Sequence, residues 1–304
     1  MIDLCRVLRL KGIMATSCHF YENSYNFKPD ICLKLDNIKF PQAKLKHFFN
    51  KALTQYDIFH FYFGQTFFPD KSDLEILKKA GKKMVVHHHG SEVRSLSVAR
   101  KFNPYILVKP EWTEEKIHKN LDVLSKYIDH AFVQDYELES YIKDYYNYVH
   151  IIPHAIDLKE FQVNYPTAKP VPLIVHAPTL RNLKGTEYIL EAVKSIKKSG
   201  IEFNFQLIEG KSHHSTKQIL SQADIVIDQL RIGSSGYVST EAMALGKPVI
   251  CYIRKDLMEK YPPDLPIINA NPHSITPVLQ NLINQPESWK EIGTKGRLYV
   301  ERYH

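Results

Sequence analysis

Short runs of β-branched and aromatic residues alternate along this chain with longer polar segments in which apolar residues recur at helical spacing. In the first half, the pattern predicts strands at 56–61, 83–88, 131–133 and 150–152 and helices at 72–80, 113–127 and 136–145. In the second half, it predicts strands at 173–176, 203–208, 225–227 and 249–253 and a helix at 186–199. Strands that alternate with helices are typical of parallel sheets, so the expected fold class is α/β.

A proline-rich stretch at 164–172 separates the two series and is the best candidate for an interdomain linker. A chain of 304 residues also suits two domains of ordinary size. We therefore predict two Rossmann-like parallel-sheet domains, residues 1–160 and residues 161–304. Two such lobes normally bind a ligand in the cleft between them, beyond the carboxyl ends of the strands, so the residues that directly follow strands are the candidates for function.

The composition excludes several classes of protein. Apolar residues make up 44% of the chain, which rules out a mainly disordered protein. No apolar run approaches the roughly 20 residues of a membrane-spanning helix, and the start of the chain lacks the apolar core of a secretory signal. The four cysteines stand far apart, which argues against a disulfide framework and a thiolate zinc site. We expect a cytoplasmic protein with no metal and no cofactor.

The whole chain has a net charge of +7, and its positive charge is concentrated in the first third. Residues 1–100 contain 16 Lys/Arg and 9 Asp/Glu, whereas residues 101–304 contain 24 of each. Such a bias suits anionic lipid headgroups, an acidic substrate or nucleic acid, or it serves surface solubility alone. A nucleic-acid partner is not expected, because the chain has no block of Lys/Arg and no interleaved aromatic and basic residues.

The strongest local pattern is GSSGYVSTEAMALGKPVI at 233–250. Small residues there open a helix, Gly246 ends it, and Pro248 leads into a strand. A loop of small residues at the start of a helix offers backbone N–H groups and a positive dipole end, which suit a phosphate. The carboxylate of Glu241 can accept two hydrogen bonds from a sugar diol, although an ordinary acid in the first turns of a helix is the simpler alternative.

Two cations, Arg181 and Lys184, lie between the strand expected at 173–176 and the next helix. Arg is suited to bidentate contact with a diphosphate and Lys to contact as a point charge, while a solvated charged loop is the alternative. The loop contains no GxxxxGK[ST] string, and no GxGxxG follows a strand. A dehydrogenase that binds a nicotinamide dinucleotide is therefore a weaker interpretation.

Three consecutive histidines stand in the segment HHHGSEVR at 87–94, at the end of a predicted strand. Alternation along a strand sends His88 to the opposite face from His87 and His89, so the three side chains should not converge on a metal. A histidine at a strand end beside Gly90 can hydrogen-bond a reacting group, or it is simply a buried histidine.

Taken together, these segments resemble the retaining, nucleotide-sugar-dependent glycosyltransferases of family 4 (group 1), which have the GT-B fold. The resemblance covers nearly the whole chain in order. The matching segments are HHHGSEVR at 87–94, IIPHAIDLKEF at 151–161, Arg181 with Lys184-Gly185, ADIVID at 223–228 and EAMALGKPVI at 241–250.

The resemblance implies transfer of a sugar from a UDP or GDP donor to a hydroxyl acceptor, in cell-surface polysaccharide or glycoconjugate synthesis. It implies catalytic roles for His89, Arg181 and Lys184, with His89 near the reacting sugar and the two cations on the leaving diphosphate. It implies that the donor is bound by Gly233, Ser235, Gly236, Tyr237 and Glu241. The acceptor is expected to be a saccharide or lipid-linked, with peripheral contact to the inner face of the membrane.

Three departures from the family pattern bear on function. Gly233 stands where the first glutamate of E-x7-E is usual, as in a subgroup with a glycine-rich loop, so the usual account of sugar selection does not carry over. Thr179 occupies the usual place of the arginine in the phosphate loop, and Glu92 the usual place of an aspartate. A nucleotide-sugar-binding protein with weak or no catalysis is the main alternative.

The ends of the chain also differ from the family pattern. Residues 3–12 resemble the first helix of the family, which a strand and a glycine-rich loop usually precede, and 289–304 resemble the start of its terminal helices. The resemblance therefore predicts a form shortened at its N-terminus that lacks the first strand.

Overall fold

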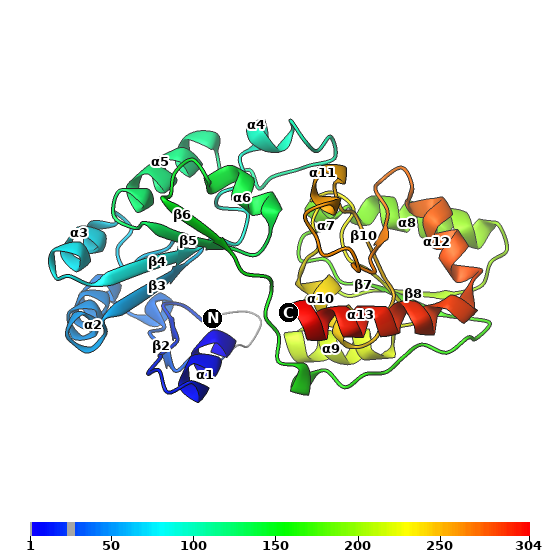
Figure 1. Ribbon diagram of the computed structural model, residues 1–304, viewed down its shortest axis with the longest axis horizontal. Helices are drawn as coiled ribbons and strands as arrows, with labels where there is room; N and C mark the ends of the chain where they lie inside the picture. The colour runs from blue at the N-terminus through cyan, green and yellow to red at the C-terminus, as the bar shows by residue number, and fades with distance from the viewer. Residues whose placement is uncertain (1, 23–27) are drawn as a thin grey trace. The chain divides into compact units, whose positions relative to one another are not determined.

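The computed structural model describes residues 2–22 and 28–304, and the chain forms two compact units (Figure 1). The first unit comprises Met1–Arg94 and Trp112–Ile152, and the second comprises Ser95–Glu111 and Pro153–His304. Each unit contains a parallel sheet, of four strands in the first and five in the second, which confirms the predicted α/β class.

The strands and helices predicted for the first unit are all present, with bounds that differ by a few residues. The structure adds the helix α2, which begins at Pro41, a residue whose fixed φ suits the first turn. Its buried side chains Leu45, Phe49 and Ala52 recur at helical spacing. The elements of this unit are α1 (Ile2–Leu10), β1 (Cys18–His19), β2 (Ile31–Cys32), α2 (Pro41–Gln55), β3 (Ile58–Tyr62), α3 (Ser72–Lys79), β4 (Lys83–His87), α5 (Glu114–Ser125), β5 (His130–Val133), α6 (Tyr136–Ile142) and β6 (Tyr148–Ile151).

One face of the first sheet carries its core. Phe59 and Phe61 on β3 and Met84 and Val86 on β4 are buried, whereas the residues between them are only partly buried. The strand order is consecutive, β3-β4-β5-β6. Because crossovers between parallel strands are right-handed, a consecutive order directs the connecting helices to the same face. Figure 1 shows α3 and α5 along one side of this sheet.

The second unit contains the strands and helices predicted for it and several shorter or later elements that the pattern did not predict. Its elements are α4 (Leu96–Ala99), β7 (Leu173–His176), α7 (Arg181–Lys184), α8 (Thr186–Lys198), β8 (Asn204–Leu207), α9 (His213–Gln222), β9 (Ile225–Ile227), α10 (Tyr237–Ala244), β10 (Val249–Cys251), α11 (Lys255–Met258), β11 (Ile268–Asn269), α12 (Ile275–Ile283) and α13 (Trp289–Tyr303).

Both faces of the second sheet are covered. Ile174 and Ile225 pack in a cluster with α8 and α12, whereas Val175 and Val226 pack in another with α10 and α13. Each of these four side chains is fully buried, which contributes about 1.5–3 kcal/mol apiece to folding. The apolar run of each strand is therefore a consequence of burial on both sides.

The order of the second sheet, β11-β10-β9-β7-β8, changes direction between β7 and β9. The chain passes from β7 to β8 on one side and to β9, β10 and β11 on the other. The carboxyl ends of β7 and β9 thus form a topological switch point, the place at which α/β sheets usually bind a ligand.

Among the described residues, no helix is long and apolar enough to cross a lipid bilayer.

Candidate functional site

The loops that leave β7 and β9 are joined at the switch point by a buried histidine. The imidazole of His176, the last residue of β7, hydrogen-bonds the carbonyl oxygen of Ile227 at 2.8 Å and the hydroxyl of Thr186 at 2.9 Å. Burial lowers the pKa of His176 to about 4, so the ring is neutral at pH 7. The backbone N–H of Leu230 donates to the carbonyl of Lys184 at 2.9 Å, which ties the second loop to the first.

Lys184 and the start of α10 meet at one buried carboxylate, that of Asp228. Its oxygens accept hydrogen bonds from Lys184 Nζ at 3.3 Å, from the N–H of Gly236 at 3.0 Å and from the hydroxyl of Ser239 at 2.7 Å. Burial raises the pKa of Asp228, but the charge of Lys184 and these hydrogen bonds outweigh it and hold the pKa below its usual range. The side-chain carbonyl of Gln229 also accepts from Lys184 Nζ at 2.5 Å.

The amides at the start of α10 differ from the sequence-based expectation. They were predicted to be open to a phosphate, but the N–H of Gly236 is bound by Asp228 and that of Ser235 donates to the Tyr261 hydroxyl at 3.3 Å. The physical reason is the carboxylate at the end of β9, which already supplies a negative charge to the positive end of the helix. Any ligand would therefore have to displace Asp228 to reach the N–H of Gly236 and Tyr261 to reach that of Ser235.

Gly233 has a backbone that a glutamate does not suit. Its φ is +92°, and a Cβ atom there would lie 2.3 Å from Cγ of Arg254 and 3.2 Å from Nδ2 of Asn103. Asn103 in turn donates to the carbonyls of Arg231 and Ile232 at 2.7 and 2.8 Å. A side chain at 233 would therefore clash, because Arg254 and Asn103 occupy the space that it would need.

Glu241 and Tyr237 lie on α10 and already have partners. One carboxylate oxygen of Glu241 is 2.6 Å from Nε2 of His213, and this hydrogen bond is the main reason that the pKa of His213 is raised. The ring of Tyr237 stacks on His154 with 3.8 Å between centroids. His213 and Asp228 were not among the site residues predicted from the sequence. For Asp228 the available signal was an acid at the carboxyl end of a buried strand.

Arg181 points away from the group around Lys184. Its guanidinium forms two hydrogen bonds with the carboxylate of Glu209, at 2.8 and 2.5 Å, and lies 3.7 Å from Glu187. Its side chain is 46% exposed, so this pair adds little stability and exchanges readily. The structure thus brings Lys184, but not Arg181, into contact with the start of α10.

His89 belongs to the first unit, in a turn held by Glu92. The buried carboxylate of Glu92 accepts the backbone N–H groups of His89 at 2.7 Å and Gly90 at 3.0 Å. The ring of His89 stacks on that of His87 at 4.7 Å, while His88 is fully buried, which confirms that the three histidines do not converge. Burial lowers the pKa of His89 to about 4, so its ring is a neutral hydrogen-bonding group at pH 7.

A buried ion pair fixes the end of the same segment. Arg94 donates two hydrogen bonds to Glu137, at 2.8 and 2.7 Å, and the hydroxyl of Tyr141 adds a third at 2.8 Å. The segment HHHGSEVR is therefore anchored to α6 through Arg94, and Glu92 fixes its backbone at His89 and Gly90.

These features define the class of fold. Two α/β units with parallel sheets, one of four strands and one of five, match the structures of GT-B glycosyltransferases. No protein-family model matches the chain, and a search of curated proteins finds no significant match.

Similar solved structures come from several bacteria. Sucrose-phosphate synthase from Thermosynechococcus elongatus is 14% identical, with a TM-score of 0.63 over 92% of this chain and 78% of that one. Anabaena HepE in complex with UDP-glucose is 14% identical, with a TM-score of 0.58 over 86% of this chain and 78% of that one. A glycosyltransferase from Rickettsia africae ESF-5 is 13% identical, with a TM-score of 0.58 over 99% of this chain and 83% of that one. At these identities the likeness establishes the fold.

Proposed function

We propose that this protein is a retaining glycosyltransferase that moves a sugar from a UDP or GDP donor to a hydroxyl acceptor. The observation that carries the proposal is the grouping of Lys184 and the start of α10 around the switch point of the second sheet, where α/β folds bind their ligands. Family resemblance in the segments that supply these residues supports the same assignment, and HepE, which has this fold, was solved with UDP-glucose.

In this proposal, the leaving diphosphate is stabilised by charges that are now paired within the protein. Lys184 and the N–H of Gly236 turn from Asp228 to the phosphate oxygens, which collect negative charge as the sugar bond breaks. Glu241 exchanges its contact with His213 for the two ribose hydroxyls. These residues supply the electrostatic stabilisation with no metal ion taking part.

His89 has a different role, because its ring is neutral. As a neutral imidazole it donates one hydrogen bond and accepts another, so it suits contact with a sugar hydroxyl near the anomeric carbon better than proton donation to the leaving group. Arg181 contributes to the diphosphate only after leaving Glu209, which makes it secondary to Lys184.

Calorimetric titration with UDP and GDP tests the donor site. Lys184→Ala and Glu241→Ala should each weaken binding of the preferred nucleotide by about 10- to 100-fold, since each removes hydrogen bonds to or from a charged group. Lys198→Ala is the matched control, because Lys198 is exposed at the end of α8 in the same unit. Wild-type affinity in both Lys184→Ala and Glu241→Ala would rule out this site.

Asp228 allows a second test with the opposite sign. Asp228→Asn keeps a side chain that accepts from Gly236 but removes the charge that competes with a diphosphate for Lys184. We expect nucleotide affinity to rise severalfold, by about 1 kcal/mol. A fall to the affinity of Lys184→Ala would mean that Asp228 positions Lys184 for binding rather than competing for it.

A nucleotide-sugar-binding protein without turnover is the second candidate. Gly233 in place of the first glutamate, with no room for a side chain, and carboxylate partners on both Arg181 and Lys184 favour it. Release of UDP or GDP from nucleotide sugars in the presence of a panel of saccharide acceptors separates the two. Tight binding without release supports the binding protein, and acceptor-dependent release supports the enzyme.

A further inference from the structure

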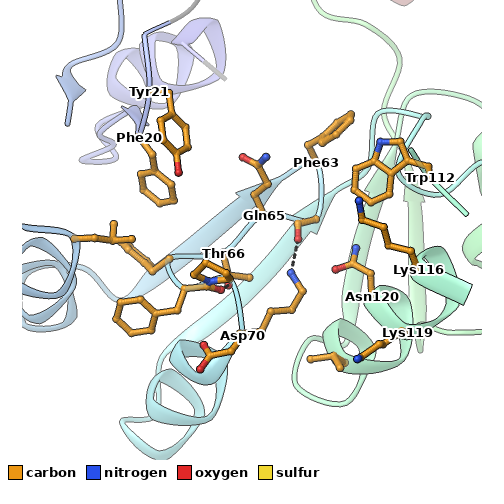
Figure 2. Close-up of a pocket in the computed structure, with 17 residues that line it drawn as sticks. Phe20, Tyr21, Phe63, Gln65, Thr66, Asp70, Trp112, Lys116, Lys119 and Asn120 are labelled. Carbon is orange, nitrogen blue, oxygen red and sulfur yellow. Dashed lines mark hydrogen bonds between the residues drawn. The ribbon is translucent and has the colours of Figure 1, made fainter. Parts of the chain in front are cut away.

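A pocket of about 630 Å³ lies in the first unit, beyond the carboxyl end of β3 (Figure 2). Its walls come from the loop that follows β3, from α5 and from the segment that contains Phe20 and Tyr21. None of the residues assigned above to the donor or to catalysis lines it. Its volume lies in the range of sites for small ligands.

The loop that forms the floor is held in a strained conformation. Phe63 has a φ of 57°, a region that phenylalanine rarely adopts, whereas the φ of 60° at Gly64 causes no strain in a glycine. Lys71 Nζ donates to the carbonyl of Gly64 at 2.8 Å and so fixes the turn from the other side of the loop. Backbone strain of this kind costs roughly 1–3 kcal/mol and is concentrated at binding and catalytic sites.

A buried carboxylate beneath the loop is fully engaged in holding it. Asp73 accepts hydrogen bonds from the hydroxyl of Thr66 at 2.8 Å and from the N–H groups of Phe67 and Phe68 at 3.0 and 3.2 Å. The loop is thereby shaped in advance of any ligand, which lowers the entropic cost of binding.

The pocket combines positive charge with aromatic surface. Three lysines line it, Lys71, Lys116 and Lys119, against one carboxylate, Asp70. The Asp70 carboxylate is itself occupied, because it accepts from both the N–H and the hydroxyl of Ser72. The lining as a whole therefore favours an anion.

The aromatic wall is formed by Phe63 and Trp112, whose rings meet edge to face at 5.7 Å. Lys116 Nζ lies 4.6 Å from the centre of the Trp112 ring, so the lysine is held beside the aromatic surface. Figure 2 shows Phe63, Trp112 and Lys116 grouped at one side of the pocket and Phe20 and Tyr21 at the other.

An unpartnered donor adds an independent observation. Nδ2 of Asn120 is buried and has no hydrogen-bond partner among the described residues, although it lies at the pocket beside Gly64. A buried donor without a partner costs about 1–3 kcal/mol, so its retention calls for an explanation. A ligand oxygen would satisfy it once the Asn120 side chain turns toward the pocket, because the nitrogen itself is buried.

We propose that this pocket binds a phosphorylated saccharide. Lysines recognise phosphate as point charges, aromatic faces cover the apolar face of a sugar ring, and the Asn120 amide donates to a sugar or phosphate oxygen. A role of this saccharide as the acceptor of the transfer rests on the proposed function. The binding of the saccharide is independent of that function, because the pocket shares no residue with the donor site.

Calorimetric titration of the full chain, without nucleotide, tests the proposal with four probes: inorganic phosphate, glucose, glucose 6-phosphate and a sugar diphosphate on a short isoprenoid chain. We expect saturable binding of glucose 6-phosphate that weakens with added salt and is at least about tenfold tighter than binding of phosphate or glucose alone. Quenching of fluorescence that is lost in Trp112→Phe places the ligand in this pocket, since the other tryptophan, Trp289, is fully buried in the second unit.

Three variants separate a ligand contact from a structural role. Asn120→Leu should weaken glucose 6-phosphate binding about tenfold while its thermal stability is unchanged or higher, because the substitution removes an unsatisfied buried donor. Lys116→Ala combined with Lys119→Ala should weaken it by more, with a smaller salt dependence. Lys143→Ala, at an exposed site in the same unit, should match the wild type.

Several outcomes would overturn the proposal. They are no binding of glucose 6-phosphate at about 10 mM, equal affinity for inorganic phosphate, equal affinity for glucose, or wild-type binding in both the Asn120 and the lysine variants. Tighter binding of the isoprenoid-linked sugar than of glucose 6-phosphate assigns the pocket to a lipid-linked source, and equal binding assigns it to a free sugar phosphate. Nucleotide titration of the same variants should be unchanged, so failure here is distinct from failure of the donor site.

Discussion

Gly233→Ala measures how tightly the loop before α10 is packed. Two effects of the substitution lower the free energy of unfolding. The backbone has a φ of +92°, which alanine rarely adopts, and the new Cβ would lie 2.3 Å from Arg254 Cγ and 2.7 Å from Cδ. Arg254 cannot move away cheaply, because it is 2% exposed and its guanidinium binds Asp256 at 3.0 and 2.7 Å. The clash is therefore with the middle of a held side chain.

Gly200 is a matched control for the backbone cost alone. Its φ is +87°, and a Cβ there would meet nothing within 4 Å. The left-handed backbone costs alanine roughly 1–2 kcal/mol, offset by about 0.4–1 kcal/mol from the smaller entropy of the unfolded chain. Overpacking at Gly233 adds about 1–3 kcal/mol. We expect Gly233→Ala to cost about 2–4 kcal/mol and Gly200→Ala about 0.5–1 kcal/mol.

Urea unfolding of the second unit provides the assay. Trp289 lies buried in that unit, with its indole N–H donating to the carbonyl of Leu282 at 2.7 Å, and in a Trp112→Phe background it is the remaining tryptophan. The loss should appear as a lower midpoint at an unchanged slope. In an Arg254→Ala background, the additional cost of Gly233→Ala should fall toward that of Gly200→Ala, with a small remainder from Asn103 Nδ2 at 3.2 Å. An equal cost for the two glycine variants in the wild-type background, or no relief by Arg254→Ala, would refute the reasoning.

Three further predictions concern buried charges. Arg94→Met should lower the free energy of unfolding by about 3–5 kcal/mol in urea titration, because it strands the buried Glu137, and Arg94→Met with Glu137→Gln should recover part of the loss. Glu241→Gln should move the NMR titration midpoint of His213 down toward the ordinary pKa of histidine, and an unmoved midpoint would contradict the pairing. The raised pKa of His213 stabilises the folded state below about pH 6.5, and this stabilisation is lost as the pH rises through the folded-state pKa. Burial lowers the pKa of Lys247 to about 8, so the free energy of unfolding should rise between about pH 8 and 10.5, where the lysine has lost its proton only in the folded state. Lys247→Met should reduce that rise, and an undiminished rise would point to other groups.

The alternation of short apolar runs and amphipathic segments was enough to predict the α/β class. Runs such as 173–176 and 225–227 are apolar throughout because both of their faces are buried, and this local signal survives without tertiary information. The helix α2 was not predicted, because its single buried stripe, Leu45, Phe49 and Ala52, is spread over a segment rich in lysine.

The site was only partly predictable for a related reason. Spacing within a segment led to the prediction of Lys184, Gly236 and Glu241 as candidates, since each belongs to a short local pattern. Their partners, Asp228 and His213, come from elsewhere in the chain, and one-dimensional spacing carries no information on which strand ends lie side by side.

The sequence by itself determined the spacing of apolar residues in each helix and strand, the distribution of charge along the chain and the small residues at the start of α10. Each of these depends only on neighbours along the chain. Tertiary structure decided the strand order that creates the switch point, the pairing of Lys184 with a buried carboxylate and the steric exclusion of a side chain at Gly233 by Arg254. These features arise from contacts between residues far apart in sequence, whose free energies depend on burial and distance in three dimensions.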